Sequence, residues 1–116
     1  MTYGFRAPPI GINPPGILFD FCLNGCLFKF EFCWFKADGF HVYVLEMPIC
    51  TNKHLSLDDD KLNLFHNEHG RAIWIARDYT PNDVDGAKRL ARLWAVNVLQ
   101  YMKCGTRFWF PRDNGY

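Results

Sequence analysis

Alternating apolar and polar positions between residues 17 and 47 predict three consecutive β-strands. Two dipeptides, Asn24-Gly25 and Asp38-Gly39, interrupt these runs. Both favour the positive φ angles of a two-residue type I′ hairpin turn. Counting outward from each turn then pairs the strands, for example Phe19 with Phe30. We therefore expect an antiparallel three-stranded meander over residues 17–47.

This register places large apolar side chains on one face of the meander, because directly opposed strand residues point the same way. The expected inner face consists of Ile17, Phe19, Phe21, Leu23, Phe28, Phe30, Phe32, Trp34, Tyr43, Leu45 and Met47. The outer face is mixed and carries Leu18, Asp20, Cys22, Leu27, Lys29, Glu31, Cys33, Phe35, Val42, Val44 and Glu46. In this register Asp20 lies opposite Lys29, and Glu31 lies opposite Glu46.

The second half of the chain predicts a hairpin and one long helix. Short β-rich runs near residues 62–66 and 71–77 flank a polar turn, and a further strand is expected near residues 106–110. The expected helix covers residues 81–104. Its core-facing stripe repeats at three- and four-residue steps and comprises Val84, Ala87, Ala91, Trp94, Val98 and Tyr101.

The ends of this helix carry recognisable capping residues. Thr80 suits the N-cap, Pro81 suits the first helical position, and Asp83 is the acid of a capping box. Gly105 suits the C-terminal cap. A helix on one face of an antiparallel sheet buries both apolar surfaces, so the predicted fold class is α+β, with residues 1–116 as a single domain. Residues 1–16 are rich in proline and glycine and predict an extended arm.

Composition excludes several broad classes of protein. The formal net charge is +1 and hydrophobic residues make up 49% of the chain, so neither a strongly basic polyanion binder nor a disordered chain is indicated. The five cysteines fit no paired zinc-knuckle spacing, which favours reduced thiols. The chain shows neither a secretion signal nor a membrane-length apolar run, so we expect a cytoplasmic protein without membrane contact.

Three groups of residues carry chemistry that a small hydrolase or a metal site would need. They are the carboxylates Glu31 and Glu46, the histidines His66 and His69 with Glu68 between them, and the thiol Cys50 with His54. Paired carboxylates can share a proton, histidines in a turn can ligate a metal, and a thiol nucleophile needs a nearby base. Each pattern is more often structural. We therefore assign no catalytic residue, no metal ligand and no cofactor.

Basic residues concentrate in the second half of the chain and suggest nucleic-acid or nucleotide binding as an alternative function. This set comprises Arg71, Arg77, Lys88, Arg89, Arg92, Arg107 and Arg112, with Trp74, Tyr79 and Trp109 as stacking groups. Asp78, Asp83 and Asp85 dilute the positive field, and no RNA-binding signature accompanies it.

The surplus of apolar residues points instead to a protein partner. Cys33, Phe35, Val42 and Val44 share the outer face in the predicted register, and such a face needs a cover. Either residues 48–66 or the arm cover it, or a second copy or another protein does. Exposed aromatic and arginine side chains dominate binding hot spots. The predicted contact residues are therefore Phe35, Arg89, Arg92, Trp109 and Arg112.

The leading functional prediction is a small non-enzymatic interaction protein that binds a protein partner or forms a homodimer. In size and in its lack of motifs the chain resembles small phage-type or accessory proteins that act by binding, such as inhibitors of host defence systems. This resemblance assigns no role to any residue. Nucleic-acid binding and a small hydrolase remain the alternatives.

Overall fold

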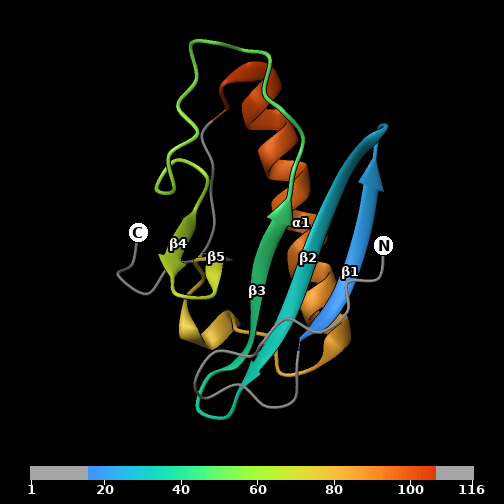
Figure 1. Cartoon of the computed structure of the whole chain (residues 1–116), viewed down its shortest axis with the longest axis vertical. Coiled ribbons are helices and arrows are strands. Elements are labelled where there is room, and N and C mark those ends of the chain that lie inside the picture. Colours follow the sequence, from blue (N-terminus) through green and yellow to red (C-terminus); the bar gives the residue numbers. More distant parts are fainter. Residues whose placement is uncertain (1–15, 107–116) are drawn as a thin grey trace.

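A five-stranded antiparallel sheet and one long helix make up most of the structure, a computed structural model that describes residues 16–106 (Figure 1). The elements are β1 (Ile17–Leu23), β2 (Cys26–Phe35), β3 (Gly39–Glu46), β4 (Leu64–Asn67), β5 (Gly70–Ile73), the 3-10 turn η1 (Arg77–Tyr79) and α1 (Val84–Cys104). The strand order is β1-β2-β3-β5-β4. The predicted α+β fold is confirmed. The predicted arm up to residue 15 and the strand predicted near 106–110, beyond Thr106, lie outside the described residues.

The first hairpin has the predicted register. Asn24 and Gly25 both adopt positive φ angles, 52° and 77°, as a type I′ turn requires. Strands β1 and β2 pair Phe19 with Phe30 and Asp20 with Lys29. Because the turn consists of two residues with strong local preferences, nearest-neighbour chemistry was enough to predict it.

The second hairpin does not have the predicted register. Its turn is closed by the Asp38 N–H, which donates to the Phe35 carbonyl at 3.0 Å, so Asp38-Gly39 is at the end of the turn and not at its centre. Gly39 has a φ of 103°, and a Cβ there would lie 2.6 Å from the Pro81 carbonyl oxygen. Glycine is therefore required by the close approach of the segment before α1.

This change moves alternate residues of β3 to the other face of the sheet. Phe32 pairs with Val42 and Phe30 with Val44, so these two valines face the helix, contrary to the prediction. Tyr43 pairs with Glu31 and belongs to the opposite face. The slip is an odd number of residues, and side chains alternate along a strand, so the predicted faces of β3 are exchanged.

The ends of β3 depart from the prediction as well. The register shifts between Lys29 and Phe30, which leaves Leu45 as the extra residue of a bulge, and Lys29 then pairs with Glu46 at 4.0 Å. Leu45 is therefore not an inner-face partner of Phe32. Met47 follows the end of β3 and still packs, partly buried, against the main core.

The helix begins three residues later than predicted. Asp83 is its N-cap and accepts a hydrogen bond from the Gly86 N–H at 2.6 Å, whereas Thr80 ends η1. Pro81 stays outside α1 because its carbonyl accepts the Phe40 N–H of β3 at 2.8 Å. At the other end the prediction is confirmed: Gly105 adopts a φ of 67° and donates to the Tyr101 carbonyl.

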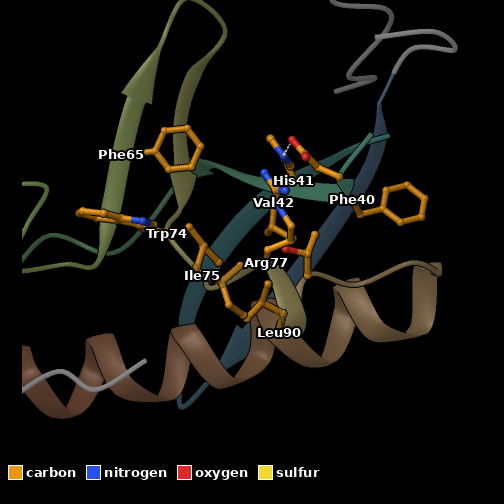
Figure 2. A pocket seen from close by; sticks show the side chains of 11 residues that line it. Phe40, His41, Val42, Phe65, Trp74, Ile75, Arg77 and Leu90 are labelled. Carbon is orange, nitrogen blue, oxygen red and sulfur yellow. Dashed lines mark ion pairs between the residues drawn. The ribbon is translucent and has the colours of Figure 1, made fainter. Parts of the chain in front are cut away.

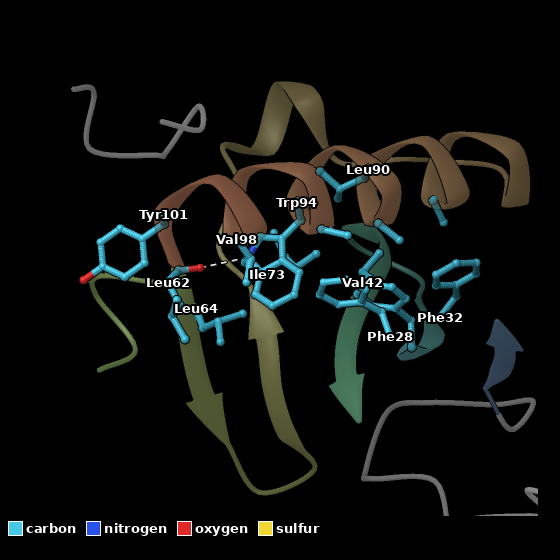
Figure 3. Packing of buried hydrophobic residues seen from close by; sticks show 14 of the residues in the cluster. Phe28, Phe32, Val42, Leu62, Leu64, Ile73, Leu90, Trp94, Val98 and Tyr101 are labelled. Carbon is cyan, nitrogen blue, oxygen red and sulfur yellow. Dashed lines mark hydrogen bonds between the residues drawn. The ribbon is translucent and has the colours of Figure 1, made fainter. Parts of the chain in front are cut away.

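The main core lies between α1 and the sheet (Figure 3). Every member of the predicted helix stripe packs into it, with Val84 partly buried. Trp94 lies at its centre, edge-on to Phe28 and Phe30 with ring centroids 6.2 and 6.0 Å away. Its indole N–H donates to the Leu62 carbonyl at 2.8 Å, which ties the segment before β4 to the helix.

A smaller apolar cluster lies on the sheet face opposite the helix. It consists of Cys33, Tyr43 and Ala72, with Phe35 and Phe65 packed against it. No disulfide joins the five cysteines, all of which are within the described residues. In residues 16–106 the structure contains no helix long and apolar enough to cross a membrane.

Candidate functional site

The predicted contact residues occupy different parts of the fold. Phe35 is partly buried on the face opposite the helix, where its ring stacks on His41 with centroids 4.0 Å apart. Arg92 lies over the Phe19 ring at 5.5 Å. Arg89 is exposed and lines a groove beside η1. The other two predicted contact residues, Trp109 and Arg112, lie outside the described residues.

A pocket of about 370 Å³ opens where β3 and β5 diverge (Figure 2). The two strands share a single bridge, between Tyr43 and Ala72. Beyond it, the pocket lies between residues 40–42 of β3 and residues 73–75. The β3–η1 pocket is lined by Asp38, Phe40, His41, Val42, Phe65, Ile73, Trp74, Ile75, Arg77, Thr80 and Leu90. In Figure 2, Phe65 and Trp74 lie on one side and Phe40 on the other, with His41 and Arg77 between them.

His41 gives this pocket its titratable group. Its Nε2 lies 3.3 Å from an Asp38 carboxylate oxygen, and its buried Nδ1 has no hydrogen-bond partner among the described residues. Burial lowers the pKa of His41 below its usual value, and the Asp38 charge and hydrogen bond only partly oppose that effect. The imidazole is therefore held largely neutral near pH 7.

A second hollow, of about 320 Å³, lies between η1 and the start of α1. The η1–α1 groove is lined by Ile75, Tyr79, Pro81, Asn82, Asp83, Gly86, Arg89, Leu90 and Leu93. Tyr79 and Leu93 are large and exposed, at 60% and 53% of their surface. The groove and the β3–η1 pocket share Ile75 and Leu90 as wall residues, so they are adjacent hollows on either side of η1.

The predicted carboxylate pair does not form. Glu31 lies opposite Tyr43, and Glu46 lies opposite Lys29, because the β2–β3 register differs from the expected one. Cys50 does not make the expected contact with a histidine: its thiol donates to the Asn52 carbonyl at 3.6 Å. The backbone N–H of His54 binds the Asn52 side chain.

The two turn histidines also separate. His66 is exposed on β4 opposite Arg71, while the His69 ring reaches across to β2. His69 Nε2 lies 2.8 Å from Glu31 Oε1 and 3.6 Å from Cys33 Sγ. Sequence reasoning missed this cluster. The i, i+2 spacing of Glu31 and Cys33 placed them on one face, but His69 joins them only through the sheet order and the β4–β5 turn.

The basic residues are dispersed over the fold. Arg71 Nε is 2.9 Å from Asp59, and Lys88 and Arg92 both lie over the Phe19 ring. Arg77, the first residue of η1, lines the β3–η1 pocket, and Arg89 of α1 lines the η1–α1 groove. Comparison of the chain with family models, with curated proteins and with solved structures found no match.

Proposed function

We propose that this chain is a non-enzymatic protein-binding domain whose contact surface straddles η1. This η1 surface consists of His41, Ile75, Arg77, Tyr79, Arg89 and Leu93. The observation that carries the proposal is the pair of hollows that share Ile75 and Leu90, with strongly exposed Tyr79 and Leu93 at their edge. Adjacent hollows of this size can receive neighbouring side chains of one partner segment.

The residue types on the η1 surface are those of binding hot spots. Tyrosine and arginine are enriched there, and anchors of this kind fill small, well-defined pockets at the centre of an interface. A large exposed leucine beside a tyrosine is costly to leave in water and contributes when a partner covers it. Arg89, predicted from the sequence as a contact residue, lies within this surface.

Charge restricts the chemistry of the partner segment. Arg89 lines the η1–α1 groove and is exposed, so this groove presents a guanidinium, whereas Arg77 lines the β3–η1 pocket together with the Asp38 carboxylate. The Asp83 carboxylate in the groove is engaged in capping α1. The segment that fits best carries large apolar side chains with carboxylates beside them, because a guanidinium binds a carboxylate through two parallel hydrogen bonds.

Nucleic-acid binding is less well supported by the same residues. A nucleic-acid surface needs cations that follow a phosphate backbone, whereas Arg71 is paired with Asp59 and acidic Asp78 adjoins Arg77. Glu31 and Glu46 do not lie opposite each other, so they do not support a hydrolase site. The expected roles of a homodimer and of a defence-system inhibitor stay predictions.

Affinity capture from the source cells with matched variants tests the proposal. Leu93→Ser and Arg89→Ala should each lower the affinity for the captured protein about 30-fold. This is the change expected from loss of a hot spot of about 2 kcal/mol. The controls are Val96→Ser and Arg92→Ala, which change another exposed apolar residue and another exposed arginine on α1 outside the groove. They should retain binding.

Two results would contradict the proposal. One is capture that the control variants weaken as much as the groove variants do. The other is capture that disappears on nuclease treatment and falls steeply with salt, which would identify nucleic acid as the partner.

A further inference from the structure

We infer that Glu31, Cys33 and His69 form a binding site for a transition-metal ion of the zinc class. Their ligand atoms Oε1, Sγ and Nε2 all lie within 4.8 Å of one another. Both the carboxylate and the thiol approach the same nitrogen, Nε2 of His69, at 2.8 and 3.6 Å. A carboxylate and a thiol that serve a catalytic imidazole approach opposite nitrogens, so this arrangement is a set of converging ligands and not a catalytic triad.

The fold holds the three ligands in place from two directions. Glu31 and Cys33 alternate on the outer face of β2, and His69 is in the two-residue turn between β4 and β5. Asn67 fixes that turn, because its Oδ1 accepts the His69 N–H at 2.9 Å and the Gly70 N–H at 3.2 Å. The Asn67 amide donates to the Tyr43 hydroxyl at 2.9 Å. The Tyr43 ring meets the His69 ring edge-on, with centroids 4.6 Å apart.

The distances suit a tetrahedral ion after a small adjustment. With Zn–S of about 2.3 Å and Zn–N of about 2.05 Å, tetrahedral angles place sulfur and nitrogen about 3.6 Å apart. The Cys33 to His69 distance already has that value. The corresponding nitrogen-to-oxygen distance is about 3.4 Å. The Glu31 carboxylate therefore has to retreat by about 0.6 Å, a movement within reach of a side chain with three rotatable bonds.

Burial shields the three ligands from competing water. The side chains of Glu31 and His69 are 3% and 6% exposed, and Cys33 is fully buried. Away from water, the electrostatic attraction between these ligands and a cation is stronger than at the surface. A divalent cation that binds a thiolate and a carboxylate is neutralised by them, and the set then has no net charge.

The ligand types select among metals. A thiolate and an imidazole favour zinc and its neighbours over magnesium or calcium, which require oxygen ligands. Within residues 16–106 the converging set has three members, and a three-ligand zinc site takes its fourth ligand from water or another donor. This inference is independent of the η1 surface, which these three residues do not line.

Titration of the reduced, untagged full chain with Co²⁺ tests the site. Cobalt substitutes for zinc and reports a thiolate ligand by sulfur-to-metal charge-transfer absorption in the near ultraviolet. We expect one Co²⁺ per chain with that absorption, and its displacement by one equivalent of Zn²⁺. Because metal binding displaces protons from the ligands, affinity should fall as the pH is lowered.

Variants assign the ligands. Cys33→Ser should abolish the charge-transfer absorption, whereas Cys22→Ser, an exposed thiol on β1, should leave it unchanged. Glu31→Gln retains the shape of the side chain but removes its charge. Its zinc affinity should fall by more than the roughly 10- to 100-fold that results from loss of a residue that only hydrogen-bonds to a ligand. Asn67→Ala, which loosens the His69 turn, should weaken zinc about 10-fold. Circular dichroism of each variant shows whether it is folded. If Cys33→Ser does not fold, the zinc affinity of Glu31→Gln tests the site instead.

The inference is overturned if the folded wild type shows no charge-transfer absorption with excess Co²⁺. It is overturned equally if Glu31→Gln binds zinc as tightly as the wild type. In either case the cluster is a buried Glu31–His69 hydrogen bond with a neighbouring thiol and no metal function.

Discussion

Replacing Trp94 with phenylalanine removes one polar contact and part of one ring from the centre of the main core. The Trp94 side chain is fully buried and donates its N–H to the Leu62 carbonyl at 2.8 Å. Phenylalanine cannot donate, so that carbonyl loses this hydrogen bond, while the edge-on contacts with Phe28 and Phe30 are partly retained.

The expected loss of unfolding free energy is about 3 kcal/mol. Leaving a buried acceptor without its donor costs about 1–3 kcal/mol. The smaller ring leaves a void of about 40 Å³, which adds about 1 kcal/mol at about 24 cal/mol per Å³. Together these are a large fraction of the 5–15 kcal/mol or so that stabilises a typical domain.

Urea unfolding followed by far-ultraviolet circular dichroism measures this change without relying on tryptophan fluorescence. Trp34→Phe is the matched control. Trp34 is only partly buried, with its ring 5.0 Å from Phe40 at the end of the hairpin, so we expect a loss below about 1 kcal/mol. If Trp94→Phe costs no more than Trp34→Phe, the core as described is wrong.

Three further predictions concern single residues. Gly39→Ala should destabilise the chain by more than about 2 kcal/mol, because its Cβ meets the Pro81 carbonyl at positive φ, whereas Gly25→Ala, with nothing within 4 Å, should cost about 1 kcal/mol in the same urea assay. Asp83→Ala should cost about 1 kcal/mol through loss of the N-cap and Asp85→Ala about half as much or less, so equal losses would contradict the cap assignment. Burial lowers the pKa of His41 below 6.5, so the unfolded chain binds more protons and stability is lost as the pH falls below about 6.5 and through the folded pKa. The unfolding free energy should fall less between about pH 7.5 and about pH 5 in His41→Gln than in the wild type. The control His54→Gln, at an exposed histidine, should lose as much as the wild type.

Local signals were enough to predict the first hairpin and the helix. Asn24-Gly25 both need positive φ, and that need is met within the turn itself. The helix stripe depends only on the 3.6-residue period, and Gly105 ends the helix as expected. These features require no knowledge of distant residues.

The second hairpin was mispredicted because its glycine serves a long-range contact. Gly39 is needed where β3 approaches Pro81, which is more than forty residues away in the chain. The start of α1 was misplaced for the same reason, since the Pro81 carbonyl is bonded to Phe40. A dipeptide pattern cannot distinguish a glycine required by a turn from one required by packing.

The candidate sites depend on the same long-range arrangement. The β3–η1 pocket exists because β3 and β5 share one bridge, and the metal-ligand cluster exists because His69 reaches across from the β4–β5 turn. No pattern of neighbouring residues in the sequence predicts either the single β3–β5 bridge or the position of His69. The exposure of Arg89 was predictable, since it lies off the apolar stripe of α1.

The register of β3 is the point on which both sites depend, because it decides that Val42 faces the helix and that His41 and Tyr43 face away. Side-chain nuclear Overhauser effects in a uniformly labelled sample measure it directly. We predict cross-peaks between Phe32 and Val42 and between the rings of Tyr43 and His69. Cross-peaks between Phe32 and Leu45, with none between Tyr43 and His69, would contradict the account.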